Sequence, residues 1–123
     1  LCDVFVMPSR ADLKSCDVEG FGIVFIEANA CGKPVIAGRS GGMADAVIDG
    51  ETGILVDPND PDELADSLTR VIKDSSFARR LGQRGRTRAV QEFKWNLIAT
   101  RVDEIMQRLV SGKKINAFWH REH

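Results

Sequence analysis

The sequence predicts an α/β protein in which a parallel sheet is flanked by helices and followed by a helical C-terminal segment. Short stretches of strand and helix character alternate over the first half of the chain, which is typical of a parallel sheet. The first strand is a nearly continuous run of apolar β-formers, and such a strand is buried on both faces. The alternating stretches are residues 3–8, 23–31, 34–37, 43–48 and 53–57.

Length and composition are those of an ordinary soluble globular protein. The chain has 123 residues, of which 43% are apolar and 28% charged, enough for one domain or part of one. No apolar run approaches the roughly 18 residues of a membrane span, and no signal peptide is visible. Three cysteines, at positions 2, 16 and 31, lack metal-ligand spacing. We interpret them as reduced thiols of a cytoplasmic protein, the last one in a buried helix.

The chain opens inside its first predicted strand, without an initiator methionine or a polar lead-in. Natural domains seldom begin in mid-strand, so we expect further chain upstream. A partial sheet of this kind leaves its first strand as an open edge, and proteins rarely leave such an edge uncovered. We therefore expect the missing upstream chain or another copy of the protein to pair with it.

A glycine-rich loop leads directly into the first predicted helix. Gly20 and Gly22 allow the backbone to approach a ligand closely, and Gly32 with Lys33 ends the helix over residues 23–31. The first turn of a helix presents unpaired N–H groups and the positive end of the helix dipole. The loop therefore suits a phosphate or another anion.

Glu27 is the one charged residue in this otherwise apolar helix, which we expect to be buried. A buried carboxylate is costly unless it is paired or hydrogen-bonded. Helical side chains lean toward the N-terminus, so Glu27 should reach toward Glu19 in the loop, and two carboxylates would flank the anion site. Two plainer interpretations stay open: a Gly-x-Gly turn is common, and Glu27 could pair with Lys33 or Arg39.

The segment from Glu19 to Glu27 resembles the Glu-x7-Glu donor signature of retaining glycosyltransferases of the GT-B architecture, group 1 (family 4). Further stretches follow the family's order and approximate spacing, so the resemblance covers about residues 1–110. The loop at residues 9–18 is longer than in many members and resembles that of the phosphatidylinositol mannosyltransferases. Ala44 and Asp45 are mild departures from the family's usual Pro and Glu. The matching stretches are residues 3–9, 28–38, 40–42 and 49–56.

The resemblance implies the C-terminal part of a Rossmann-like donor-binding domain in residues 1–110, with a flexible tail in residues 111–123. It implies transfer of a sugar from a nucleotide-sugar, with GDP-mannose as a candidate, to an acceptor hydroxyl, with retention and without a metal or cofactor. Glu27 would hold the ribose hydroxyls, and Glu19, as the catalytic residue, would contact the donor sugar. The backbone that meets the sugar and diphosphate would be that of Gly20, Phe21, Gly22, Ile23 and Val24.

In this family the basic phosphate clamp and the base-recognition loop lie upstream, and the acceptor groups lie in a separate N-terminal domain. We therefore expect the chain alone to be inactive. The likeness to phosphatidylinositol mannosyltransferases also suggests peripheral contact with the inner face of the membrane. A non-catalytic nucleotide-binding or regulatory module that kept the fold is an alternative.

A second glycine-rich turn, at residues 40–42, follows the strand at residues 34–37 and opens a short helix at residues 43–48. It should lie at the same sheet edge as the loop with Gly20. The turn is either part of the same pocket or a tight turn that needs unusual dihedral angles. Turns at Asp49-Gly50 and Thr52-Gly53 lead to the third strand.

Three helices complete the prediction. Asp60 is a plausible N-cap, with Pro61 at the first helical position and Glu63 completing a capping box. The second helix is rich in arginine and interrupted by Gly82 and Gly85, and the third is amphipathic. The helices are residues 61–73, 75–93 and 94–110.

The arginine-rich helix could make this an interaction domain that binds nucleic acid or anionic lipid. Arginines on all sides of a mid-chain helix are more often a solvated face, so we expect no nucleic-acid partner. Trp95 is interpreted as a core contact. Both histidines, at 120 and 123, lie in the tail, so spacing predicts no metal site. The arginines of the helix are at positions 79, 80, 84, 86 and 88.

Overall fold

The computed structural model describes residues 2–10 and 20–112. The chain divides into two compact units, Leu1–Gln91 and Glu92–His123. Within the described ranges, no helix is both long enough and apolar enough to cross a membrane. Most of the predicted tail, from residue 113 onward, lies outside the described residues.

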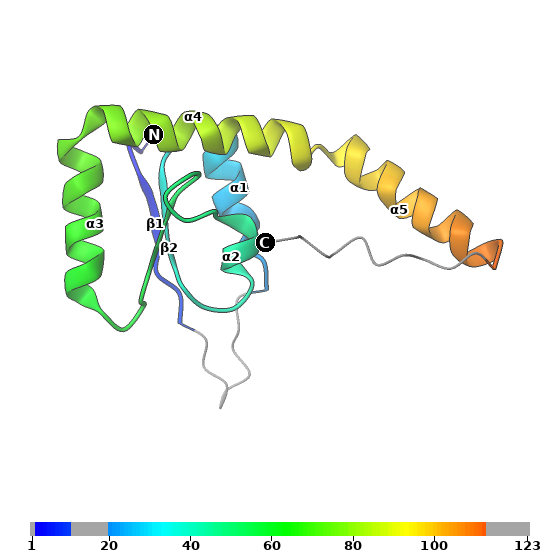
Figure 1. Ribbon diagram of the computed structural model, residues 1–123, viewed down its shortest axis with the longest axis horizontal. Coiled ribbons are helices and arrows are strands. Elements are labelled where there is room, and N and C mark those ends of the chain that lie inside the picture. Colours follow the sequence, from blue (N-terminus) through cyan, green and yellow to red (C-terminus); the bar gives the residue numbers. More distant parts are fainter. Residues whose placement is uncertain (1, 11–19, 113–123) are drawn as a thin grey trace. The chain divides into compact units, whose positions relative to one another are not determined.

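The first unit contains a three-stranded parallel sheet flanked by helices, which confirms the predicted fold class (Figure 1). Strand β2 (Val35–Gly38) lies between β1 (Phe5–Met7) and β3 (Ile54–Val56). Ala37 of the central strand is in register with Met7 on one side and with Leu55 on the other. Because the strands are parallel, their carboxyl ends share one edge of the sheet, where the predicted glycine turns follow them.

Helices cover both faces of the sheet, as the apolar first strand predicts. Side chains alternate along the strands, and the two sets belong to separate cores. Helices α1 (Ile23–Ala30) and α2 (Met43–Ala46) contribute to one core, and α3 (Pro61–Lys73) and α4 (Ser75–Glu92) contribute to the other. The first core contains Phe25, Val35, Ala37, Met43, Ala46, Val47 and Leu55, and the second contains Ile36, Val56, Val71, Phe77 and Leu81.

Side chains close the outer edge of β3. The Val56 carbonyl accepts a hydrogen bond from the Arg39 N–H (2.7 Å) and so points toward β2. Neighbouring residues of a strand direct their backbone groups to opposite sides, so those of Leu55 point outward. There the Asp49 carboxylate accepts from the Leu55 N–H (2.9 Å), and the Arg39 guanidinium donates to the Leu55 carbonyl (2.7 Å). A further strand would therefore have to join the described sheet at β1, its other edge.

Helix α4 is tied to α1 and α2 by arginines. Arg88 is 7% exposed, and its guanidinium donates to the carbonyls of Ala46 (2.7 Å) and Asp45 (2.7 Å) at the end of α2. Arg86 donates to the Ala30 carbonyl at the end of α1. The predicted solvated face is therefore wrong for Arg88, because helix carbonyls in the fold satisfy its charge. The arginines that are exposed, as predicted, are Arg79, Arg80, Arg84 and Arg86.

Helix α4 runs without a break through Gly82 and Gly85, so the predicted interruption is wrong. Both glycines face α1 and the residues that end it. A Cβ at Gly82 would overlap the Gly32 carbonyl, and one at Gly85 would overlap the Asn29 side chain. Asn29 is itself buried, and its amide donates to the Thr52 carbonyl (3.1 Å). The glycines are needed for close packing of two elements and not for a bend.

The predicted N-cap of α3 is confirmed, whereas the capping box is half formed. Asp60 accepts from the N–H groups of Asp62 (2.9 Å) and Glu63 (3.0 Å). Glu63 does not return a bond to Asp60, whose N–H donates to the Asp57 carbonyl (3.0 Å). Glu63 accepts from the Asp57 N–H instead (2.6 Å). The cap therefore ties the helix to the end of β3.

Asp74 likewise caps the start of α4. Its carboxylate accepts from the Phe77 N–H (2.9 Å) and from the Ser76 hydroxyl (2.7 Å). These two bonds hold the pKa of the Asp74 carboxyl below its usual value. The contribution of the cap to stability is thus present at neutral pH and is lost as the pH falls through the lowered pKa.

The second unit contains α5 (Trp95–Val110), close to its predicted bounds. Its apolar residues have helical spacing, but none of its residues is buried. Trp95 is 79% exposed, so the predicted core contact is wrong, because this residue opens α5 and belongs to neither core. The other large apolar side chains exposed on α5 are Val102, Met106, Leu109 and Val110.

Cys2 and Cys31 are free thiols, in agreement with the predicted reduced state. Cys31 is exposed, so its predicted place in a buried helix is wrong: it is the C-cap of α1, beyond the last helical turn. Cys16 lies outside the described residues.

Replacing Arg88 by alanine should lower the free energy of unfolding by about 2–3 kcal/mol, because two carbonyls lose a charged donor and a buried side chain leaves a void. Arg84→Ala, on the exposed side of the same helix, should change it by less than about 0.5 kcal/mol. Denaturant titration of both variants measures the two changes in the free energy of unfolding. Small and equal effects would mean that Arg88 does not hold α4 against α2.

Candidate functional site

Two glycine turns meet at the carboxyl edge of the sheet. After β1, the Ser9 carbonyl accepts a hydrogen bond from the hydroxyl of Ser40, in the turn after β2 (3.0 Å). In the same turn, Gly42 lies against the backbone of Gly20, in the loop before α1, with no room for a Cβ between them. The expectation that both turns share one edge is confirmed. This is the edge at which open α/β sheets bind their ligands.

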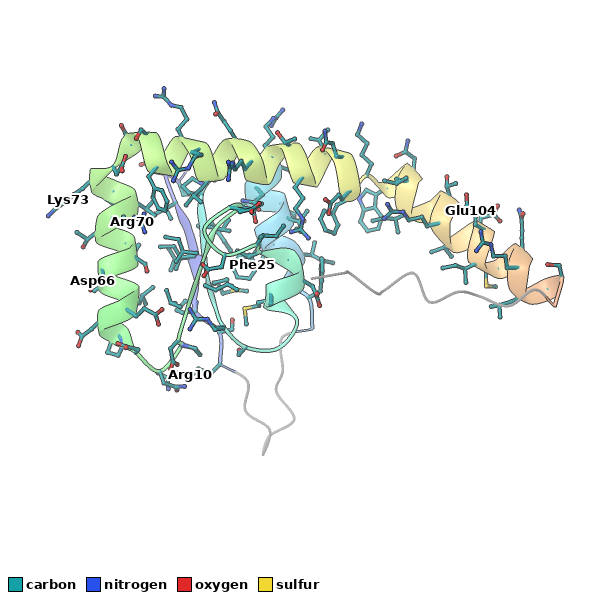
Figure 2. The ribbon with its side chains drawn as sticks, viewed as in Figure 1. Arg10, Phe25, Asp66, Arg70, Lys73 and Glu104 are labelled. Carbon is teal, nitrogen blue, oxygen red and sulfur yellow. The ribbon has the colours of Figure 1, made fainter. Side chains whose placement is uncertain are left out.

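Gly22 turns the loop into α1 through a conformation that favours glycine. It is the N-cap of the helix, with φ 77° and ψ 54°, in the left-handed region. A Cβ there would lie 2.6 Å from the Phe25 ring. That ring, labelled in Figure 2, is fully buried. It packs edge-on against the ring of Phe5 of β1, with the ring centroids 5.6 Å apart. The core therefore fixes where the loop enters the helix.

Among the described residues no side chain caps the start of α1, although the Phe25 N–H donates to the Gly22 carbonyl (3.0 Å). Gly22 has no side chain, so no side chain of the N-cap residue accepts from the first N–H groups. Gly20, two residues earlier, is exposed, and a Cβ built on it would meet no atom of the described residues within 4 Å. A helix start without a side-chain cap, next to an exposed glycine, fits the anion site that the sequence predicts at this helix end.

One side of α1 is exposed, although its apolar sequence predicts a buried helix. Ile23 is 57% exposed and Val24 is 39% exposed, and Glu27 is exposed as well. The prediction is wrong because the sheet and α2 cover Phe25 and α4 covers Asn29, while the described residues leave the opposite side open.

Glu27 therefore meets solvent at the surface and is not a carboxylate in a core. The alternative pairing with Lys33 or Arg39 is not observed among the described residues, where Arg39 pairs with Glu63 (3.4 Å). Glu27 lies one turn after Ile23 on the exposed side of α1, so the two side chains are neighbours on the helix. An exposed carboxylate near uncapped N–H groups can accept hydrogen bonds from a polar ligand.

Glu19, predicted as the catalytic residue, lies outside the described residues, as does most of the loop that carries it. The placement of two carboxylates around one helix end thus stays a prediction. The backbone of residues 20–24 is described and lies at the sheet edge. No group of three or more potential metal ligands occurs in the described residues, and the expected absence of a metal remains untested by this observation.

Sequence reasoning gave the turn at residues 40–42 no definite role. Its contact with Gly20 joins residues that are far apart in the chain, and no periodicity reports such a contact. The signal available was the repetition itself: two glycine turns, each ahead of a helix, in one parallel sheet.

Comparison with known proteins supplies the family. Residues 1–88 match the model of the glycosyl transferases group 1. The chain is similar to a GDP-mannose-dependent alpha-(1-6)-phosphatidylinositol monomannoside mannosyltransferase from Mycolicibacterium smegmatis, with 42% identity over 114 residues. That alignment covers 93% of this chain and 29% of the mannosyltransferase.

Solved structures with the same fold include sucrose-phosphate synthase from Thermosynechococcus elongatus, with a TM-score of 0.78 and 40% identity over 90% of this chain. HepE from Anabaena, in complex with UDP and glucose, gives a TM-score of 0.76 and 30% identity over 86% of this chain. The matched regions are 26% and 27% of those two chains. The chain thus spans less than a third of the length of each of these three proteins.

Gly22→Ala should lower the free energy of unfolding by about 1–3 kcal/mol, because alanine is strained at a positive φ and its methyl would press on the Phe25 ring. Gly20→Ala is the matched control: its methyl enters open space, and the change should be below about 0.5 kcal/mol. Thermal or denaturant unfolding of both variants measures this. Two equally stable variants would contradict the left-handed entry into α1.

Proposed function

The chain belongs to the group 1 glycosyl transferases, and we propose that it forms the donor-binding part of an enzyme that transfers a sugar from a nucleotide-sugar to an acceptor hydroxyl with retention at the anomeric carbon. Its parallel sheet flanked by helices is part of the GT-B donor domain. The observation that carries the proposal is the start of α1 behind exposed Gly20, which no side chain of the described residues caps.

The start of α1 would bind the diphosphate of the donor. When the glycosidic bond breaks, negative charge develops on the leaving diphosphate. The N–H groups of residues 20–24 and the helix dipole would stabilise this charge without reorganising, because the packing of Phe25 and Gly22 already holds them in place. Such preorganised donors also work without a metal ion, and we propose a metal-free reaction.

Glu27 would bind the ribose of the nucleotide. Its carboxylate is exposed and follows the helix start by one turn, which suits acceptance of hydrogen bonds from two neighbouring hydroxyls. Ile23, exposed on the same side, would offer an apolar contact beside it. Glu19 would contact the donor sugar as the catalytic residue, as the family signature implies.

GDP-mannose is the donor that we propose. The support is 42% identity to a mannosyltransferase that is named for its dependence on GDP-mannose. That enzyme is also named for a phosphatidylinositol monomannoside, so we propose that the reaction takes place on the cytoplasmic side, at the inner face of the membrane. UDP bound to HepE marks a uridine nucleotide as the competing choice.

The remaining parts of the reaction would come from chain beyond these 123 residues. We propose that the complete enzyme adds a phosphate clamp, a base-recognition loop and an acceptor-binding domain, and that its upstream strand joins the sheet at β1. The capped edge of β3 supports this choice, since the outward groups of Leu55 are bonded to Asp49 and Arg39.

In the complete enzyme, Glu27→Gln should weaken binding of GDP-mannose by about ten- to a hundredfold, which corresponds to the loss of charged hydrogen bonds to ribose. Glu51→Gln, an exposed glutamate in the turn before β3, is the matched control and should leave the affinity unchanged. Isothermal titration calorimetry measures both dissociation constants. Equal affinity of Glu27→Gln and the wild type would remove Glu27 from the donor site.

The 123-residue chain alone should show no multiple-turnover sugar transfer, because the parts that bind the base and the acceptor are proposed to lie elsewhere. Incubation with radiolabelled GDP-mannose and a lipid acceptor, beside the complete enzyme, tests this. Sustained turnover by the chain alone would refute the proposed division. A complete enzyme that binds nucleotide but transfers nothing would favour a non-catalytic module.

A further inference from the structure

We propose that Gly42 is a positioning residue for the donor site. It lies outside the segment from Glu19 to Glu27, in the turn at residues 40–42, which is another of the stretches that resemble the family. By leaving out a side chain, it lets the turn after β2 lie directly against the backbone ahead of α1 and thereby sets where the phosphate-binding N–H groups stand. The inference rests on the proposed function and adds a residue to the same site.

Gly42 is required because its surroundings leave no room for a side chain, and not because of its backbone conformation. Its φ of −82° and ψ of 10° are open to any residue. A Cβ on it, however, would overlap the Gly20 carbonyl oxygen, and it would lie 2.9 Å from the Gly20 carbonyl carbon and 3.5 Å from the Phe21 Cα. All three atoms belong to the backbone, so no flexible side chain can move aside. A methyl group at this position must shift one of the two turns.

The turn that carries Gly42 is the better anchored of the two. Ser40 donates its hydroxyl to the Ser9 carbonyl (3.0 Å), and a Cβ at Gly38 would lie 3.1 Å from the Ser9 nitrogen. On the other side of Gly42, the Met43 side chain is fully buried in the core. Because the turn is fixed before and after Gly42 and Phe21 packs against the first core, the displacement would fall first on exposed Gly20.

The body of α1 would stay in place while its approach loop moves. Phe25 and Asn29 are buried, and the Asn29 amide is bonded to the carbonyls of Lys33 (3.1 Å) and Thr52 (3.1 Å). A shift of the loop would therefore separate the N–H groups of residues 20–22 from those of the first helical turn. A diphosphate that needs both sets would lose affinity, whereas the fold would keep its cores.

Gly82 provides a matched control at the opposite end of α1. A Cβ at Gly82 would overlap the Gly32 carbonyl oxygen, so Gly82→Ala makes the same kind of backbone clash away from the site. Both variants should lose thermal stability. Only Gly42→Ala should also lose donor affinity per folded molecule, which a merely structural role would not produce.

The experiment uses the complete enzyme and measures the dissociation constants of GDP-mannose and UDP-glucose by calorimetry, with the folded fraction taken from thermal melts. We expect the preferred donor to bind Gly42→Ala about ten- to a hundredfold more weakly than the wild type, and to bind Gly82→Ala within about twofold of the wild type. Unchanged affinity of folded Gly42→Ala, or an equal loss in Gly82→Ala, would overturn the inference.

If Gly42→Ala does not fold, Ser40→Ala tests the positioning role instead, because it loosens the same turn by removing one hydrogen bond and adds no atoms. A loss of donor affinity of a few fold in Ser40→Ala supports the positioning role, and wild-type affinity overturns it. A wild-type enzyme that binds neither nucleotide-sugar would instead overturn the proposed function, and this inference with it.

Discussion

Helix α1 is held at its two ends by glycine contacts that leave no room for a side chain. At the N-terminal end Gly42 lies against the Gly20 carbonyl, and at the C-terminal end Gly82 lies against the Gly32 carbonyl. Contacts between backbones are stiff, because neither partner has a rotatable side chain to adjust. The backbone that enters α1 and the backbone that leaves it are thus set within narrow limits, and the geometry of the candidate site follows from the entry.

The apolar composition of α1 has two uses in the fold. Phe25 faces the sheet and is buried, as in any packed helix. Ile23 and Val24 are exposed beside the uncapped N–H groups, where their surface is available to a donor nucleotide or to further chain. Glu27 shares that exposed side, so its charge needs no partner within the described residues. A helix whose sequence predicts uniform burial therefore has one side in the core and the other exposed.

Local signals in the sequence predict the strands, the glycine turns and the Asp60 cap, because apolar runs, glycines and capping residues act within a few positions of themselves. Contacts between distant segments could not be predicted in this way. Arg88 is buried because two helix carbonyls happen to lie within its reach, and Gly82 stays helical because α4 packs against the end of α1. The positions of the backbone around Gly22 and of Glu27 are now described, and that of Glu19 is still a prediction.

The central claim is that the start of α1 binds the diphosphate of an activated sugar. A crystal structure of the complete enzyme with GDP-mannose tests it most directly. We expect diphosphate oxygens within about 3 Å of backbone nitrogens among residues 20–24, with the Glu27 carboxylate bound to the ribose hydroxyls. A nucleotide bound elsewhere, with these N–H groups still facing solvent, would contradict the account.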